Sequence, residues 1–273
     1  MNGAPPRGPA LLFCPADRPE RYAKAAAAAD TVILDLEDAV AASAKGDARR
    51  ALRTAELDPA RTVVRVNAAS TGLREDDLAA VRDTRYRTLM LAKTESPAEL
   101  DPLDGFAVVA LCESPRGVVA AEELAAHPAV VALSWGAEDL VAALGGTSSR
   151  AADGRYRDYA RYARARVLIA AGAAGKAAYD TVHLDIADDA GLRAEAEDAA
   201  ASGFAGALCI HPRQVPVLRA AYAPSPDALA RARRILAAAD SAENGVFAVD
   251  GRMVDEPLLR QARRLVALAE EVR

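Results

Sequence analysis

The chain has 273 residues, 27% of them charged, and carries a net charge of -5 with a pI near 5.4. This acidic balance excludes nucleic acid as an expected partner, because phosphate binding needs a basic face. No apolar run reaches the roughly 18 residues of a membrane span. The first residues lack the apolar core of a signal peptide, and the three cysteines form no paired motif, so we expect a cytoplasmic protein with reduced thiols.

Eight short apolar runs alternate with amphipathic segments rich in Ala, Arg and Glu. The runs are predicted strands at residues 11–15, 31–37, 62–67, 88–93, 107–113, 130–135, 181–186 and 207–211. They are continuously apolar rather than alternating, which is typical of a parallel sheet covered on both faces. The segments between them predict helices, among them 19–28, 41–54, 75–81, 115–126, 156–174 and 191–201.

Eight strand–helix units in a chain of this length predict a closed (β/α)8 barrel, which we expect to occupy residues 1–222. A doubly wound open sheet is the alternative, and the lack of a glycine-rich dinucleotide motif after the first strand counts against it. Residues 223–273 hold a predicted helix at 226–240, a polar turn at 243–245 and a last helix from about 256. They exceed what barrel closure needs, so we expect a C-terminal lid or oligomerisation segment.

Polar residues stand at the carboxyl end of strand after strand, and in a barrel these ends converge on the face that carries the active site. They are Asp17, Arg18, Glu37, Asp38, Arg65, Asn67, Lys93, Glu113, Glu138, Asp139, Asp185 and His211. A single charge at a strand end is often only solvated. So many polar residues at one face of the barrel predict that they form a shared site.

The carboxylates of this set predict a site for Mg²⁺, which prefers oxygen ligands and binds one or two carboxylates together with water and substrate. Zinc is not expected, since the three histidines are not spaced to bind it. Arg65 has two open interpretations: it grips a substrate carboxylate or carbonyl, or it neutralises Glu37 or Asp38. Lys93 stands where an aldolase could carry a Schiff-base lysine, but nearby carboxylates would keep it protonated, so we expect an electrostatic or structural role.

Eight segments, in this order, resemble the citrate lyase beta-subunit-like family, within the wider group of magnesium-dependent HpcH/HpaI-type aldolases and malyl-CoA lyases. They are LLFCPADRPERYAKA, VILDLEDAV, VVRVNA, LMLAKTES, ALCESPRGV, WGAEDL, CIHPRQV and GRMVDEP. The resemblance covers nearly the whole chain. It implies a (β/α)8 barrel, a homotrimer, Mg²⁺ as the cofactor, and cleavage or formation of a carbon–carbon bond in a 3-hydroxyacyl-CoA.

The resemblance also implies roles for individual residues of the catalytic centre. Glu113 and Asp139 match metal ligands, and Arg65 matches an arginine that orients the oxo-acid and its developing oxyanion. Glu37 and Asp38 match acids around the metal and its waters, and we expect both to take part in catalysis.

Three further sets of residues follow from the same resemblance. Asp255 in GRMVDEP matches a lid aspartate that reaches the active site of a neighbouring subunit. The residues expected to bind the small substrate are Arg65, Ala137, Glu138 and Asp139, and those expected to bind coenzyme A are Phe13, Arg18 and Lys24.

The expected activity is a Mg²⁺-dependent lyase reaction that divides a 3-hydroxyacyl-CoA into an acyl-CoA and an oxo- or keto-acid. An acyl-CoA thioesterase or a malate-synthase-like condensation on the same site is an alternative. A non-catalytic protein that binds coenzyme A or an oxo-acid is an alternative of a different class. The sequence does not choose among malyl, citramalyl, 3-hydroxy-3-methylglutaryl and citryl thioesters, and a free 2-hydroxy or oxo acid without coenzyme A is a further alternative.

Overall fold

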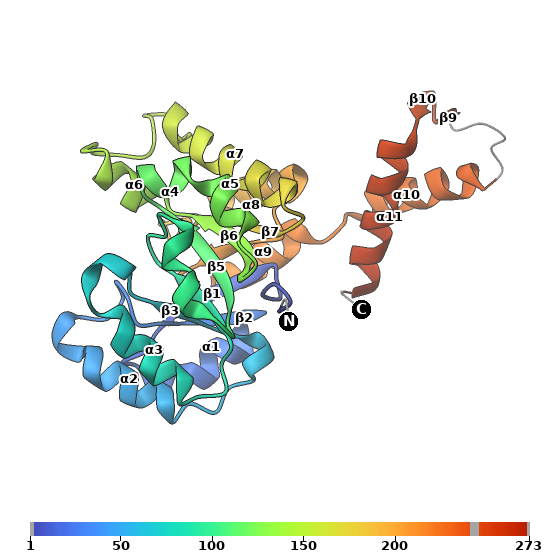
Figure 1. Ribbon diagram of the computed structural model, residues 1–273. Helices are drawn as coiled ribbons and strands as arrows, with labels where there is room; N and C mark the ends of the chain where they lie inside the picture. Colours follow the sequence, from blue (N-terminus) through green and yellow to red (C-terminus); the bar gives the residue numbers. More distant parts are fainter. Residues whose placement is uncertain (1–2, 241–245, 272–273) are drawn as a thin grey trace. The chain divides into compact units, whose positions relative to one another are not determined.

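Eight parallel strands form a closed barrel in the computed structural model, which describes residues 3–240 and 246–271 (Figure 1). The strands are β1 (Ala10–Pro15), β2 (Thr31–Asp35), β3 (Thr62–Val66), β4 (Thr88–Leu91), β5 (Ala107–Cys112), β6 (Val130–Trp135), β7 (Ala177–Asp180) and β8 (Gly206–Cys209). Each strand pairs with the next, and β8 pairs with β1 from Ala10 opposite Ala207 onward. The predicted barrel is therefore confirmed, and the open sheet is excluded.

Apolar side chains fill the interior of the barrel, which explains the continuous apolar runs. Every residue of β2 is buried, because one face of the strand meets the barrel interior and the other meets helices. The interior cluster consists of Leu11, Ile33, Val63, Met90, Val109, Leu111, Ala132, Tyr179 and Leu208. The three cysteines are buried on β1, β5 and β8 with no disulfide among them, as predicted.

Helices rich in small residues follow the strands. They are α1 (Tyr22–Ala28), α2 (Lys45–Arg53), α3 (Arg74–Arg82), α4 (Pro115–Val119), α5 (Ala121–Ala126), α6 (Ala137–Ala143), α7 (Asp158–Ala173), α8 (Asp189–Ser202) and α9 (Gln214–Tyr222). In α7, Ala160, Ala163, Val167, Ala170 and Ala171 are buried, which is the helical spacing of one face turned toward the core. Alanines at these positions combine helix propensity with close packing.

The seventh strand was predicted wrongly. It is Ala177–Asp180 and not residues 181–186, since Ala177 pairs with Ala132 of β6 and Tyr179 pairs with Gly206 of β8. The segment that alternates polar and apolar residues after it leaves the barrel as a loop, where Leu184 is 54% exposed. Asp185 therefore lies in this loop and not at a strand end.

The chain divides into two compact units, Met1–Leu218 and Arg219–Arg273. In the second unit, α10 (Pro226–Ala239) packs against α11 (Glu256–Glu271) beside a short hairpin of β9 (Phe247–Val249) and β10 (Arg252–Val254). The hairpin was not predicted, and the turn predicted at 243–245 lies outside the described residues. Among the described helices, none is long and apolar enough to cross a membrane.

Candidate active site

Four carboxylates from three strand ends meet around one ammonium group at the carboxyl end of the barrel. Glu37 and Asp38 follow β2, Glu113 follows β5, and Asp139 lies in the first turn of α6 after β6. The Nζ atom of Lys93, just after β4, is 2.5 Å from Glu37 Oε1, 3.1 Å from Asp38 Oδ2, 3.2 Å from Asp139 Oδ1 and 3.9 Å from Glu113 Oε1. The convergence expected from the strand-end pattern is therefore present for these five residues.

Glu113 is the most deeply buried of the expected metal ligands. Burial and the negative charge of Asp139 raise the pKa of its carboxyl to about 8. Its Oε1 accepts a hydrogen bond of 3.0 Å from the backbone N–H of Lys93. Its Oε2 lies where a Cβ on Gly136 would come within 2.6 Å, so a glycine at that position leaves the room that the carboxylate occupies.

The two acids after β2 differ in their environment. Burial raises the pKa of Glu37, although the charges of Arg65 and Lys93 oppose the rise. Burial also acts on Asp38, but there the hydrogen bond and charge of Lys93 outweigh it and lower the pKa. Burial would lower the pKa of Lys93, yet the hydrogen bond to Glu37 and the charge of Glu113 outweigh that effect and raise it. Lys93 is thus held as an ammonium, which is unsuited to Schiff-base chemistry.

Arg65 is anchored by Asp35, a partner that the sequence did not predict. Its Nε and Nη2 donate to the two carboxylate oxygens of Asp35 at 2.7 and 2.6 Å, while Nη1 lies 3.0 Å from Glu37 Oε2. The guanidinium also stacks 4.6 Å over the ring of Phe13. Neutralising Glu37 was one of the two interpretations of Arg65, but its bidentate partner is Asp35. Asp35 also accepts hydrogen bonds from the backbone N–H groups of Glu37 and Ala39. It therefore fixes both Arg65 and the turn at residues 36–39, called the acidic turn because it carries Glu37 and Asp38.

A second support lies behind the acidic turn and was missed from the sequence. Lys45 of α2 is buried, and its Nζ donates to the backbone carbonyls of Leu36 and Glu37 at 2.6 and 2.7 Å. It donates also to Oδ1 of Asn67, whose own amide donates to the carbonyl of Leu36. A lysine in an amphipathic helix is normally solvated, so only the fold reveals this role.

The other residues expected to bind substrate or coenzyme A lie near the start of α6 and on the β1–α1 segment. Ala137 is buried at the start of α6, and Glu138 is exposed and accepts a 2.6 Å hydrogen bond from Ser149 Oγ. Arg18 and Lys24 are exposed on the β1–α1 segment. They thus present two cations beside the barrel mouth.

His211 and Asp255 complete the expected set. His211 is exposed, and its Nδ1 accepts from the backbone N–H of Arg213, so it serves the local turn. Asp255 precedes α11 in the second unit, where its backbone carbonyl accepts from Leu259 and its carboxylate lies 3.4 Å from the N–H of Leu258. Asp255 thus stands directly before the first residue of α11.

A cavity of about 1010 Å³ lies away from the acidic cluster, between α7, α8 and the 148–157 loop. Glu138, Arg150, Tyr156, Arg164, His183 and Glu195 are among its lining residues. Glu37, Glu113 and Asp139 do not line it. The cavity is thus separate from the acidic residues at the barrel mouth. We identify the candidate active site by those residues and not by the size of the cavity.

The acids at the barrel mouth fit a hard divalent cation. Among residues 3–240 and 246–271, no three His, Cys, Asp or Glu side chains are arranged to hold a metal by themselves. A pair of carboxylates completed by water and substrate is instead the usual arrangement for Mg²⁺. Burial and the charge of Asp139 disfavour the ionised form of Glu113, and a divalent cation held at these carboxylates would favour it. Glu113 and Asp139 are the residues that would hold it.

The raised pKa of Glu113 predicts a pH dependence of stability in the metal-free protein. Since this pKa is about 8 in the folded state against an ordinary value of 4.5, the folded protein retains the proton where the unfolded chain releases it. The contribution of Glu113 to stability is therefore fully present below about pH 4.5 and is lost as the pH rises to about 8. In EDTA, we expect the free energy of unfolding to fall more steeply from about pH 5 to 8 in the wild-type protein than in Glu113→Gln, as measured by urea denaturation. Equal slopes for the two proteins would contradict the prediction.

The closed barrel and its acidic mouth define an enzyme of the (β/α)8 class with its chemistry at the carboxyl ends of the strands. The chain belongs to the HpcH/HpaI aldolase/citrate lyase family, whose family model matches residues 10–212. The family expected from the sequence motifs is thereby confirmed.

Similar proteins of this family span nearly the full length of the chain. One solved structure is the crystal structure of protein CitE from Mycobacterium tuberculosis in complex with magnesium, acetoacetate and coenzyme A. Its sequence is 56% identical to this chain, and the two structures align with a TM-score of 0.93 over 97% of this chain and 98% of that one. The mitochondrial citramalyl-CoA lyase of Homo sapiens is 33% identical over 97% of this chain and 86% of its own. The (3S)-malyl-CoA thioesterase of Cereibacter sphaeroides is 34% identical over 96% of this chain and 94% of its own.

Proposed function

We propose that the protein is a Mg²⁺-dependent lyase that cleaves a 3-hydroxyacyl-CoA thioester into an acyl-CoA and an oxo- or keto-acid. The observation that carries the proposal is the meeting of Glu113, Asp139 and Arg65 with the acids after β2 at the barrel mouth. The relatives support it, since one is a citramalyl-CoA lyase and a 56% identical protein was crystallised with magnesium, acetoacetate and coenzyme A.

The site residues can divide the work of carbon–carbon cleavage. Mg²⁺, held by Glu113 and Asp139, would supply Lewis-acid polarisation of the substrate oxygens. Asp35 uses two of the five N–H donors of Arg65, which leaves its outer donors for Glu37 and a substrate oxygen. A preorganised guanidinium of this kind stabilises the negative charge that develops on an oxygen as the bond breaks.

Proton transfer needs a base for the 3-hydroxyl group and an acid for the acyl-CoA enolate. Glu37 and Asp38 are the candidates for the first step, because their carboxylates lie in the cluster beside Arg65 and Lys93. Asp255 is the candidate for the second step. The exposed cations Arg18 and Lys24 suit the phosphates of coenzyme A. Phe13 of β1 stacks against Arg65 of β3 and is the third residue proposed to bind coenzyme A.

The test of this proposal is incubation of the purified protein with a panel of 3-hydroxyacyl-CoA thioesters, with and without Mg²⁺, resolved by mass spectrometry. We expect Mg²⁺-dependent release of a shorter acyl-CoA with an oxo- or keto-acid. The malyl-CoA thioesterase relative makes hydrolysis the second candidate function. Free coenzyme A with an intact hydroxy acid would favour hydrolysis, and absence of turnover from protein that binds coenzyme A would favour a binding role.

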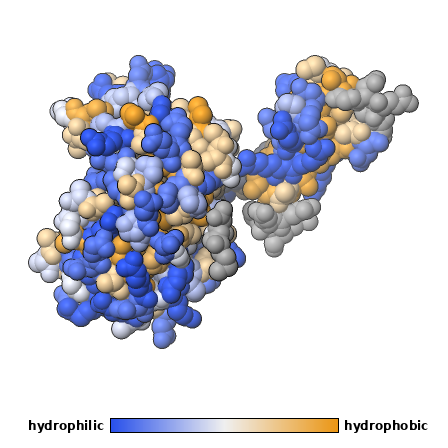
Figure 2. Space-filling view, in the orientation of Figure 1, coloured by the Kyte–Doolittle hydropathy of each residue, from blue (hydrophilic) through white to orange (hydrophobic). Residues whose placement is uncertain are grey.

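We propose further that the protein is a homotrimer in which Asp255 of one protomer serves the barrel of the next. The second unit exposes the large apolar side chains Val246, Met253 and Leu268, and Figure 2 shows hydrophobic residues on its visible face. Exposed apolar surface on a small unit suits contact with another copy of the chain. A cytoplasmic location, expected from the sequence, stays a prediction.

Complementation between two inactive variants tests the shared site. Glu113→Gln damages the barrel part of a site and Asp255→Asn damages the lid part, so each variant alone is expected to be inactive. When both are co-expressed at equal dose, random assembly leaves about a quarter of the sites with both parts intact, and lyase activity should recover to about that fraction of wild type. A mixture no more active than its parents would contradict action in trans.

A further inference from the structure

Lys93 has a backbone conformation that residues other than glycine rarely adopt. Its φ is +48°, and among the described residues only Asp250 shares a positive φ without being glycine. A lysine in the left-handed region is strained and persists only where its surroundings hold it. Here the backbone N–H of Lys93 donates to Glu113 Oε1, so the strained residue is tied directly to an expected metal ligand.

The ammonium group of Lys93 lies at the centre of the acidic cluster formed by Glu37, Asp38, Glu113 and Asp139. The ammonium contacts acids from β2 on one side, Glu37 at 2.5 Å and Asp38 at 3.1 Å. On the other side it contacts the expected metal ligands, Asp139 at 3.2 Å and Glu113 at 3.9 Å. The ammonium thus occupies the position of a cation among four carboxylates.

We propose that Lys93 is a tethered counter-ion whose ammonium competes with the divalent metal for Glu113 and Asp139. This inference rests on the proposed function, in which those two residues hold the metal. The contacts to Glu37 and Asp38 include the shortest that the ammonium makes, so it can keep them while it gives up Asp139. A lysine suits this exchange because its charge is compact and its four-carbon stem is flexible. Lys93 is a positioning residue in this scheme: it holds the acids together without the metal and limits the affinity of the loaded site.

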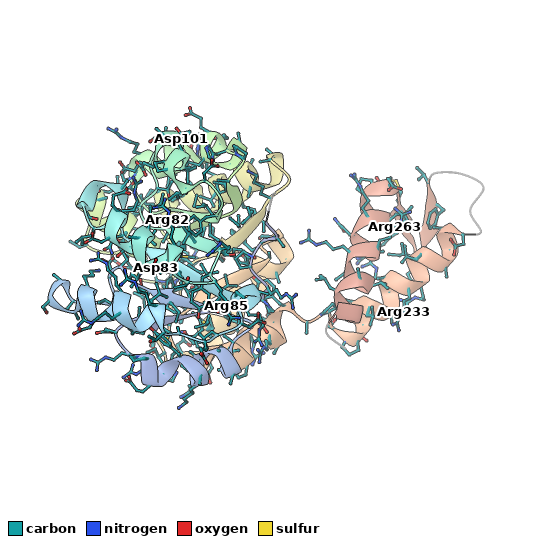
Figure 3. The ribbon with its side chains drawn as sticks, turned by 60° about the horizontal axis from the view of Figure 1, so that its bottom comes forward. Arg82, Asp83, Arg85, Asp101, Arg233 and Arg263 are labelled. Atoms are coloured by element: carbon teal, nitrogen blue, oxygen red, sulfur yellow. The ribbon has the colours of Figure 1, made fainter. Side chains whose placement is uncertain are left out.

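Isothermal titration of the metal-free protein with Mg²⁺ tests the proposal. Removing the ammonium removes a positive charge beside the bound cation, so Lys93→Met should bind Mg²⁺ with a Kd lower than that of wild type by about tenfold or more. Lys93→Arg keeps the positive charge and should therefore bind Mg²⁺ more weakly than Lys93→Met. Arg85→Met is the matched control for net charge, because Arg85 is exposed in the connection before β4, at the opposite end of the strand that leads to Lys93 (Figure 3).

Thermal unfolding gives a second measurement. Without metal, Lys93→Met should have a lower Tm than wild type, because four carboxylates lose their shared counter-ion, and the rise in Tm on adding Mg²⁺ should be larger than in wild type. If Lys93→Met does not fold without metal, Lys93→Met with Glu37→Gln restores the net charge and is compared with Glu37→Gln alone. The double variant should then bind Mg²⁺ the more tightly of the two.

A Kd for Lys93→Met equal to or higher than that of wild type would overturn the inference and show that Lys93 supports metal binding. Absence of Mg²⁺ binding by both proteins would also overturn it, since Glu113 and Asp139 would then hold no metal. Tighter Mg²⁺ binding by Lys93→Met, in a protein that cleaves no thioester, would support the counter-ion role while rejecting only the lyase activity. The two failures are therefore distinguishable.

Discussion

Glu113→Gln is expected to lower kcat/KM for Mg²⁺-dependent thioester cleavage on the order of 10³-fold or more. The substitution keeps the size of a side chain that is 3% exposed, but it replaces a carboxylate oxygen with an amide nitrogen, which does not ligate Mg²⁺. Steady-state kinetics across a range of Mg²⁺ concentrations measure the loss, and titration calorimetry should show weakened metal binding in parallel.

Stability separates this effect from unfolding. The carboxyl of Glu113 is buried beside Asp139, so the neutral amide should leave the metal-free protein at least as stable as wild type near neutral pH. Glu95→Gln is the control, since Glu95 follows the same strand as Lys93 and accepts from Ser114 Oγ at 2.7 Å but makes no contact with the ammonium. It should retain wild-type kcat/KM. More than a tenth of wild-type activity in Glu113→Gln would show that Glu113 is not an essential metal ligand.

The barrel could be predicted from the sequence because most of its strands are continuous apolar runs. The failure at β7 has a physical cause. The strand is the short segment Ala-Ala-Tyr-Asp, which follows an alanine-rich helix and reads as its continuation, while the loop after it has the polar–apolar alternation of a strand. Pairing with β6 and β8 decides the matter, and such pairing is not visible in local composition.

The candidate site was predictable to the level of strand ends but not to the level of partners. The position of Glu37, Lys93, Glu113 and Asp139 after their strands indicates that they share a face of the barrel. The central position of the ammonium depends on the left-handed backbone of Lys93, and no pattern of residue types gives that conformation. The hydrogen bonds of Lys45 to the acidic turn depend in the same way on how α2 packs.

Asp35 illustrates the limit most clearly. As the last residue of β2 it could face the interior or the helices, and its position in the sequence predicts no partner. The register of β2 on β3 places it opposite Arg65, and the inward direction of both side chains makes the bidentate pair. A charge at the end of a buried strand thus needs the register of its neighbour before its role can be stated.

Arg65→Met is expected to lower kcat by roughly 10²–10³-fold, because it removes the charge that we propose stabilises the developing oxyanion. It should also lower the free energy of unfolding by about 3–5 kcal/mol, since Asp35, with a side chain only 1% exposed, loses its ion-pair partner. Lyase kinetics on folded protein and urea denaturation measure the two effects separately. Both effects are expected in one residue, because Arg65 is held by Asp35 and is also the proposed partner of a substrate oxygen.

The double variant Arg65→Met with Asp35→Asn separates anchoring from catalysis. Neutralising the buried carboxylate should restore about 1–3 kcal/mol of the lost stability, but activity should stay at the level of Arg65→Met. Arg49→Met is the matched control: Arg49 is 12% exposed, against 11% for Arg65, and pairs at 2.7 Å with the buried Asp77, so stability should fall while kcat is retained. A double variant no more stable than Arg65→Met would show that Asp35 is not the charge that Arg65 compensates. Recovery of activity with stability would mean that Arg65 acts only by holding the barrel mouth together, and the oxyanion role would then pass to the metal alone.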